Sequence, residues 1–472
     1  MKKIILATVL LLAMTSVLFS AYSAVNITAE AATDEKLYIY NWGDYIGPDV
    51  IENFEIWYET ETGRTIDVVY TLYDTNEIML TNLTRGEEVL DLICPSDYAI
   101  EKLMKEGKLQ KINKSAISTI GNVDTALYSK VDEVFTEIMV GESQENMSDY
   151  FVPYMWGTLG IMYNTDVVSS EVAEEAGYGL LWNTPEIKDL NKKILIKDSI
   201  RDTYVAALMY LKETDNLPDA YKTLSVQDLI NTVNDDLLAA AEEILIEQKK
   251  VLKEYEVDIG KGDMMAGKAY ANLAWSGDAL WAIEEAAEND VNLDYFVPEV
   301  GGNVWFDGWA IPANAQNVTG ANKFIEYVCM PEIAITNSIE IGYTCAIDPA
   351  ILSTDNDVIS LLEDNEYDVD EYFADSIRYP DITSSLGVMK DFGSSQQKAL
   401  AMWERVKSAS VAGDWIIWVI IGSVAGAAAL GILLFFVFKN RKGMKGKAVV
   451  AKDAIDEEEE LEETEEDSES EE

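Results

Sequence analysis

Carboxylates and aromatic residues stand together at three places in this chain, each beside a short apolar segment. The groups are Trp42, Asp44 and Tyr45 in "YNWGDYI", Trp275 and Asp278 in "LAWSGDAL", and Trp305 and Asp307 in "VWFDGWA". Carboxylates can neutralise buried ammonium groups, and aromatic faces attract cations by about 0.5–2 kcal/mol per contact. The combination suits a site for an organic cation with a hydrocarbon chain. The same residues could instead be ordinary core and turn, since Asp44 could cap a turn and Asp278 a helix.

The residue types that are absent limit the chemistry. The chain has no histidine, the usual general base and the commonest metal ligand. Its cysteines, Cys94, Cys329 and Cys345, form no metal-ligand spacing; the last two could pair, or all could be buried thiols. We therefore predict a binding protein with no metal and no cofactor, not an enzyme. A hydrolase that uses paired carboxylates stays open as an alternative, because sequence does not place acid pairs in space.

A regular alternation of strands and helices positions these groups. Residues 36–42, 65–73 and 90–94 are typical of strands, and residues 48–62, 76–86 and 99–112 of amphipathic helices. This rhythm predicts an α/β fold with a parallel sheet and helices on both faces. Ligands bind at the carboxyl ends of strands in such sheets, and residues 42–45 and 95–98 fall there. No linker or repeat divides the region, which suits two lobes between which the chain crosses more than once.

The ends of the chain carry segments of another kind. Residues 1–31 resemble a signal peptide, with two lysines, an apolar run and small residues at cleavage spacing; an uncleaved anchor is the alternative. Residues 415–438 are apolar enough to cross about 30 Å of hydrocarbon as a helix. The basic segment that follows predicts a single-pass membrane protein with its binding domain outside the cell. Residues 439–472, basic and then acidic, should form a disordered cytoplasmic tail.

The net charge also bears on the partners. It is −50 at pH 7, and the acidic tail accounts for little of it, with 14 acidic and 6 basic residues. An acidic outward domain repels nucleic acid and attracts cations, although acidic surfaces also serve solubility. We expect no nucleic-acid partner.

Several segments together resemble the extracellular solute-binding proteins of polyamine ABC transporters, the spermidine/putrescine-binding family. They are "YIYNWGDYI", "DLICPSDYAIEKLMKEGKLQKINKS", "VPYMWGTLGIMYN", "NLAWSGDA", "VWFDGWAIPANA" and "IGYTCAI", spread between residues 37 and 407 in the family's order. The resemblance implies two α/β lobes of the periplasmic-binding-protein type (type II), joined by crossing strands, with the ligand in the cleft. It assigns residues 32–162 and 306–351 to lobe 1, and residues 163–305 and 352–410 to lobe 2.

The resemblance also implies a set of ligand-binding residues. These supply aromatic walls, hydroxyls and carboxylates: Trp42, Asp44, Tyr45, Ser96, Tyr98, Asp202, Trp275, Asp278, Trp305, Asp307 and Tyr343. Trp275 corresponds to the aromatic residue that stacks on the aliphatic chain of the ligand. Asp307 corresponds to a residue that neutralises an amine, and Asp202 to the acidic residue that binds an amine from lobe 2.

Two positions depart from the family's pattern. Ser199 stands where spermidine-type members carry a further carboxylate, and a glutamine contact is replaced near Met389. Residues 131–148 look like an insertion, and residues 415–438 lie outside the family's usual plan. We predict a membrane-anchored extracytoplasmic receptor that delivers putrescine or spermidine to the permease subunits of an ABC transporter. A receptor for another small cationic or amino-acid-like solute on the same fold is the alternative.

Overall fold

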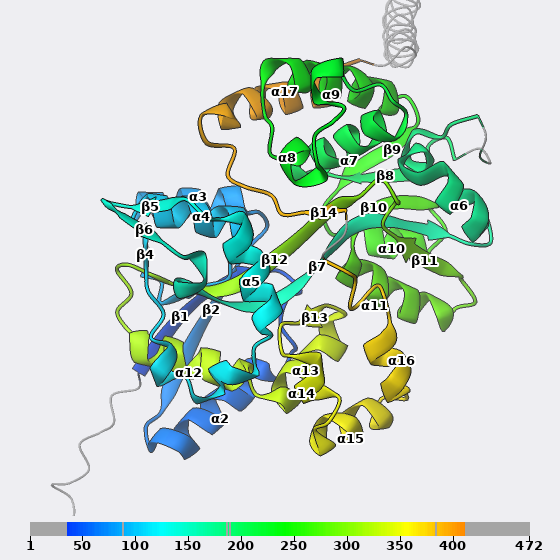
Figure 1. Ribbon diagram of the computed structural model, residues 1–472. Coiled ribbons are helices and arrows are strands. Elements are labelled where there is room, and N and C mark those ends of the chain that lie inside the picture. Colours follow the sequence, from blue (N-terminus) through cyan, green and yellow to red (C-terminus); the bar gives the residue numbers. More distant parts are fainter. Residues whose placement is uncertain (1–34, 87–88, 186, 188–189, 383–384, 411–472) are drawn as a thin grey trace, which may run out of the picture. The chain divides into compact units, whose positions relative to one another are not determined.

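Two long strands, β7 (Phe151–Asn164) and β12 (Gly302–Pro312), run antiparallel and connect two α/β lobes (Figure 1). The computed structural model describes residues 35–410, apart from 87–88, 186, 188–189 and 383–384. Both strands are buried along their whole length, as expected where a sheet is covered on both faces. The lobes together form one unit that ends at Lys407. This architecture agrees with the predicted two-lobed α/β fold.

Lobe 1 is built on parallel strands in the order β2-β1-β3, and β3 lies beside β12. Its elements are β1 (Glu35–Trp42), α2 (Val50–Thr62), β2 (Ile66–Tyr73), α3 (Asn76–Arg85), β3 (Leu92–Ile93), α4 (Asp97–Lys105), β4 (Leu109–Gln110), η1 (Lys114–Ala116), η2 (Ser118–Asn122), α5 (Thr125–Val134), β5 (Ile138–Val140), β6 (Ser143–Glu145), η3 (Met147–Asp149), α12 (Val318–Val328), α13 (Pro331–Ile341), β13 (Thr344–Cys345), α14 (Pro349–Leu352), α15 (Asn356–Asp364) and α16 (Val369–Ala374). Helices α2 and α3 end at Gly63 and Gly86, whose φ angles of 70° and 66° favour glycine.

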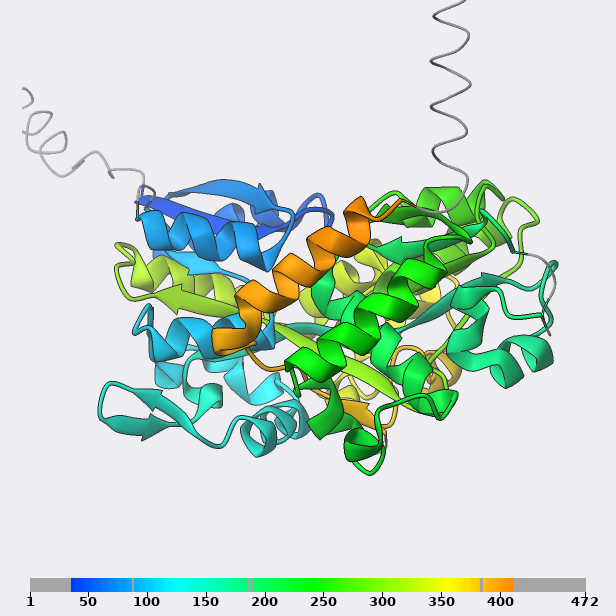
Figure 2. The same cartoon turned by 90° about the horizontal axis from the view of Figure 1, so that it is seen from above.

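Lobe 2 is built on β10, β8 and β9, with β8 parallel to both neighbours and β10 beside β7. Its elements are α6 (Ser170–Ala176), η4 (Gly177–Trp182), β8 (Ile194–Lys197), α7 (Ile200–Glu213), η5 (Asp219–Tyr221), α8 (Val226–Ile230), α9 (Asp235–Gln248), β9 (Leu252–Glu256), α10 (Gly260–Met265), β10 (Ala271–Trp275), α11 (Ser276–Ala287), β11 (Leu293–Phe296), β14 (Leu386–Gly387), η6 (Gly393–Ser395) and α17 (Gln396–Ser408). Helices α9 and α17 lie side by side (Figure 2), joined by the ion pairs Asp235–Lys398 at 2.8 Å and Glu242–Arg405 at 2.6 Å.

The last helices before the final crossing belong to lobe 1. Val358 of α15 and Tyr372 of α16 lie in the same apolar core as Phe54 of α2. The chain therefore returns to lobe 2 later than residue 352, where the sequence analysis places the boundary. The apolar pattern of a helix shows which face is buried, but not which of two cores it covers.

One local expectation is corrected, and one question left open by the sequence is answered. The predicted helix 99–112 ends at Lys105, because Gly107 adopts a φ of 64° and the next residues pair with β12 as strand β4. The three cysteines are buried free thiols, so the pairing considered for Cys329 and Cys345 is absent. The segment 131–148 contains the end of α5, the hairpin β5–β6 and the beginning of η3.

The predictions for the two ends of the chain concern residues outside the part that the structure describes. They are the signal peptide at 1–31, the membrane span at 415–438 and the tail at 439–472. Among the described residues, no helix is both long and apolar enough to cross a membrane.

Candidate functional site: an acidic and aromatic cavity between the lobes

A cavity of about 490 Å³ lies between the two lobes and against β12. All eleven residues proposed from the sequence line it: Trp42, Asp44, Tyr45, Ser96, Tyr98, Asp202, Trp275, Asp278, Trp305, Asp307 and Tyr343. The two departing positions, Ser199 and Met389, line it as well. The structure thus gathers residues that are up to 301 positions apart (42 to 343) around one space.

Parallel strands position the lobe-1 wall of the cavity. Strand β1 ends at Trp42 and β2 ends at Tyr73. The indole N–H of Trp42 and the hydroxyl of Tyr73 both donate to the carbonyl of Cys94, at 2.9 and 2.5 Å. The two rings lie 4.7 Å apart. The last side chains of β1 and β2 therefore meet the backbone that follows β3, at the carboxyl ends of three parallel strands.

A buried amide organises the second lobe-1 loop. The side-chain amide of Asn76 donates to the hydroxyls of Ser96 and Tyr98, at 2.9 and 3.0 Å. The hydroxyl of Tyr98 in turn donates to Glu77 Oε1 at 3.4 Å. Sequence reasoning missed Asn76, since it reads as the first residue of a helix; its place directly after β2 was the available signal.

Asp307 is a buried carboxylate in the centre strand of the site. It lies on β12 at an irregularity in the pairing with β7, between Asp307 and Gly308, and such bulges re-aim side chains. Only 6% of Asp307 is exposed. Its Oδ2 accepts a hydrogen bond from the Tyr45 hydroxyl at 2.9 Å, whereas Oδ1 has no hydrogen-bond partner among the described residues. Burial raises the pKa of Asp307 to about 7, against the opposing effect of the hydroxyls of Ser96 and Tyr45.

Aromatic rings connect Asp307 to a second carboxylate. The ring of Tyr343 lies 4.9 Å from that of Tyr45 and 5.7 Å from that of Trp305, both edge to face. The Tyr343 hydroxyl donates to Asp278 Oδ1 at 2.8 Å. Burial, followed by the charge of Asp278, raises the pKa of Tyr343 well above its usual value, so this hydroxyl stays protonated.

The Asp278 end of the cavity already contains cations. Lys197, at the end of β8, donates to Asp278 Oδ2 at 3.4 Å, and Lys261 lies 3.5 Å from Asp278 Oδ1. Lys197 also forms an ion pair with Glu256 at 2.9 Å, and its ammonium lies 4.1 Å from the centre of the Trp275 ring. Sequence reasoning missed Lys197 and Glu256. The feature of the sequence that could have indicated Lys197 is its place as the last residue of the apolar strand "ILIK".

Asp202 faces the cavity from the first turn of α7. It is 7% exposed, and the Ser199 hydroxyl caps this helix by accepting from the Asp202 backbone N–H. Burial raises the pKa of Asp202, against the opposing effect of the Ser199 hydroxyl and the charge of Lys197. Among the described residues, no lysine or arginine lies within 4.0 Å of the carboxylate of Asp202 or that of Asp307.

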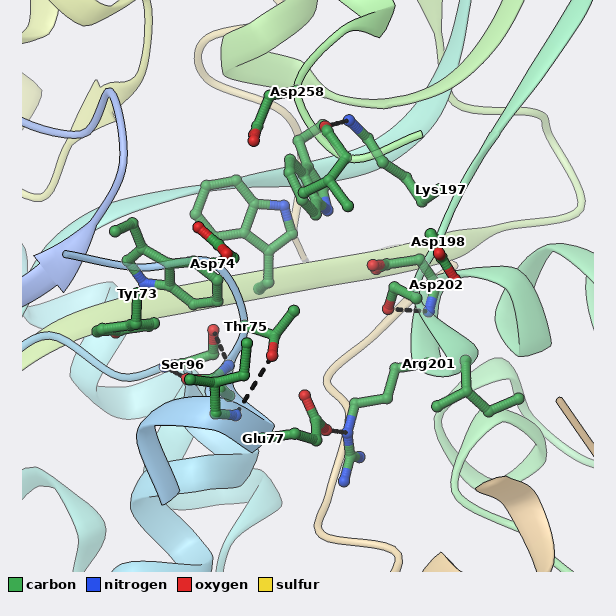
Figure 3. A pocket seen from close by; sticks show the side chains of 18 of the residues that line it. Tyr73, Asp74, Thr75, Glu77, Ser96, Lys197, Asp198, Arg201, Asp202 and Asp258 are labelled. Carbon is green, nitrogen blue, oxygen red and sulfur yellow. Dashed lines mark hydrogen bonds and ion pairs between the residues drawn. The ribbon is translucent and has the colours of Figure 1, made fainter. Parts of the chain in front are cut away.

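Arg201, the neighbour of Asp202, joins the lobes. Its guanidinium lies 3.6 Å from the centre of the Tyr98 ring and 4.1 Å from that of Phe392. It also contacts Glu77 Oε1 at 3.4 Å. Tyr98 and Glu77 belong to lobe 1, so Arg201 of lobe 2 bridges the cleft at the end opposite Lys197 and Asp258 (Figure 3).

Three further carboxylates lie at the rim. Asp44, Asp74 and Asp258 line the opening and are exposed. Asp44 adopts a φ of 49°, a left-handed conformation that aspartate and asparagine tolerate better than most residues. Asp44 therefore combines a tight turn with a place at the opening of the cavity.

The lining as a whole is suited to cations. Eleven carboxylates and four basic side chains line the cavity. Among the described residues, no cluster of three or more acidic or cysteine side chains is arranged to hold a metal ion. Aromatic faces beside carboxylates can hold an organic ammonium group and cover the methylenes attached to it.

Comparison with known proteins agrees with this chemistry. Residues 52–358 match the family model described as bacterial extracellular solute-binding protein. The chain is 32% identical to a putrescine-binding periplasmic protein of Pseudomonas aeruginosa, over 65% of this chain and 76% of the relative. It is 31% identical to a spermidine/putrescine-binding periplasmic protein of Salmonella typhimurium, over 67% and 78%. A solved structure of the spermidine/putrescine ABC transporter substrate-binding protein of Streptococcus pneumoniae is 27% identical, with a TM-score of 0.58, over 79% of this chain and 99% of the other.

Proposed function

This chain belongs to the bacterial extracellular solute-binding protein family, and we propose that it is a receptor for a small polyamine of the putrescine or spermidine type. The proposal takes its ligand class from the relatives and from the composition of the cavity. In this role the eleven lining residues predicted from sequence hold and enclose the amine.

The observation that carries the proposal is the state of Asp307. An ionised carboxylate that is 6% exposed, with one oxygen unpartnered, is costly unless a cation meets it. An ammonium group has several N–H donors and no acceptor, so it can bond to Asp307 while the rings of Tyr45 and Trp305 cover the adjoining methylenes. Burial between two lobes strengthens each of these pairings, because water is excluded.

Isothermal titration calorimetry of the purified full chain tests the ligand class. We expect saturable heat with putrescine or spermidine and no turnover of either. An absence of heat with every diamine and triamine tried would exclude a polyamine receptor. Saturation by an amino acid alone would identify a receptor for another solute, and product formation would identify an enzyme.

We further propose that the receptor is held at the cell surface by residues 415–438 and delivers its ligand to the permease subunits of an ABC transporter. The support for the anchor is the apolar sequence of that segment and the basic residues after it. A tether keeps a receptor at high effective concentration near its permease. Protease added to intact cells should remove the binding domain; its survival would contradict this orientation.

A further inference from the structure

One ammonium group is already part of the cavity. Lys197 is 2% exposed. Its Nζ donates to the carbonyl of Val257 at 2.8 Å and to Asp278 Oδ2 at 3.4 Å, and forms an ion pair with Glu256 Oε1 at 2.9 Å. Two of these oxygens accept hydrogen bonds from the ammonium, and Glu256 adds an opposite charge beside it. The centre of the Trp275 ring lies 4.1 Å from the same Nζ and covers a further side of the ammonium group.

These partners are the groups that would serve an ammonium of the ligand. The sequence predicts that Trp275 and Asp278 hold an ammonium group of the ligand, and the ammonium of Lys197 lies against both of them. Burial lowers the pKa of Lys197, but the charges of Asp278 and Glu256 more than offset this, and the pKa lies above its usual value. Lys197 is therefore charged at neutral pH.

Asp278 has no further need of a cation. It accepts from the Tyr343 hydroxyl at 2.8 Å, and Lys197 and Lys261 lie at 3.4 and 3.5 Å. The two carboxylate oxygens of Asp278 thus have three donor groups beside them, two of which are charged, and the carboxylate needs no further partner.

Within the part of the chain that the structure describes, three buried carboxylates of the cavity have no such cation: Asp97, Asp202 and Asp307. Both oxygens of Asp97 accept hydrogen bonds from backbone N–H groups, those of Tyr98 and Phe306, so its charge is already stabilised. Asp307 on β12 and Asp202 on α7 are therefore the carboxylates that need a cation, and they face the cavity from different elements. The exposed carboxylates at the rim contribute little, because solvated ion pairs are weak.

We propose that Lys197 is a specificity-determining residue whose ammonium fills the Asp278 end of the cavity, so that the receptor selects a diamine and gives no buried site to a third ammonium. This inference rests on the proposed polyamine-binding function. Two ammonium groups of a diamine neutralise Asp307 and Asp202. A third ammonium at the Asp278 end would meet Lys197 and Lys261, which repel it.

The test compares putrescine with spermidine on the full chain by calorimetry. In the wild type we expect spermidine to bind no more tightly than putrescine. The double variant K197M/E256Q removes one positive and one negative charge and frees Oδ2 of Asp278, so the affinity for spermidine relative to putrescine should rise at least tenfold. The matched control K250M/E247Q removes an exposed lysine–glutamate pair of α9 and its C-terminal end, and should leave the ratio unchanged within twofold.

Three results would overturn the inference. One is a wild type that binds spermidine more than tenfold more tightly than putrescine, a result that does not depend on the folding of any variant. Another is a double variant that melts cooperatively and keeps the wild-type ratio. The third is tighter binding of an ω-amino acid than of the diamine, which would make Lys197 a partner of a ligand carboxylate. A wild type that binds no amine would instead refute the proposed function itself.

Discussion

Replacing Asp307 with asparagine should weaken polyamine binding and stabilise the ligand-free protein at the same time. The asparagine carbonyl can still accept the hydrogen bond of Tyr45, so the substitution removes charge with little change of shape. Loss of one partner of a buried ion pair costs about 3–5 kcal/mol. Since 1.4 kcal/mol corresponds to a factor of ten, the Kd for putrescine should rise at least a hundredfold.

The effect on stability has the opposite sign and depends on pH. The pKa of Asp307 is about 7 in the folded protein and 3.8 in the unfolded reference. A carboxyl with a raised pKa loses folding free energy as pH rises from the unfolded pKa to the folded one, because the unfolded chain releases its proton first. The free energy of unfolding of Asp307→Asn should exceed that of the wild type by about 2 kcal/mol at pH 5 and about 4 kcal/mol at pH 8, as upper bounds.

Calorimetry gives the Kd, and thermal or urea unfolding without ligand at pH 5 and pH 8 gives the stability. Asp44→Asn is the matched control: Asp44 is exposed, and asparagine tolerates its left-handed φ of 49°. That variant should lose less than about fivefold in affinity, the range of a solvated ion pair, and gain no stability. Equal losses of affinity in the two variants, or an Asp307→Asn protein that unfolds more easily than the wild type at pH 8, would refute the reasoning.

Three further predictions concern the same cavity. The Kd for putrescine should rise up to tenfold for each pH unit below about 7, because protonation of Asp307 competes with the ligand; a Kd that is constant from pH 8 to 5.5 would contradict this. Gly277→Ala should weaken putrescine binding at least tenfold, because the new Cβ would lie 2.2 Å from the ring of Tyr343, whereas Gly121→Ala, with no atom within 4 Å, should have no effect. Arg201→Gln should weaken putrescine and spermidine by the same factor, about tenfold, because it removes a contact between the lobes and none with the ligand; unequal losses would place Arg201 at the ligand.

The alternation of apolar segments was sufficient to predict the first strands and helices. Strand β1, helix α2, strand β2 and helix α3 lie where their patterns place them, because each buries one face on an apolar core, the first three on one core and α3 on a neighbouring one. The end of α4 was not predicted, since Gly107 in a left-handed conformation and the pairing of β4 with β12 are tertiary features. The lobe assignment of α15 and α16 was wrong for a related reason. The apolar pattern of a helix shows which face is buried, but not against which of the two lobes that face packs.

The site shows the same division. The kinds of residue around the cavity could be read from short motifs, and the resemblance to a family brought the motifs together. What sequence did not provide was the pairing inside the cavity. Lys197 and Asp278 are 81 positions apart, and Tyr45 and Asp307 are 262 apart, so no local pattern tells which carboxylate is already neutralised and which is not.

The contacts of α17 show to which lobe the end of the unit belongs. Besides its two ion pairs with α9, the end of this helix accepts hydrogen bonds from Lys249 at the carbonyls of Val406 and Lys407. The last helix of the unit is thus fastened to lobe 2 at both ends. A tether through residues 415–438, as proposed above, would therefore act directly on lobe 2, and on lobe 1 only through the strands and contacts that join the lobes.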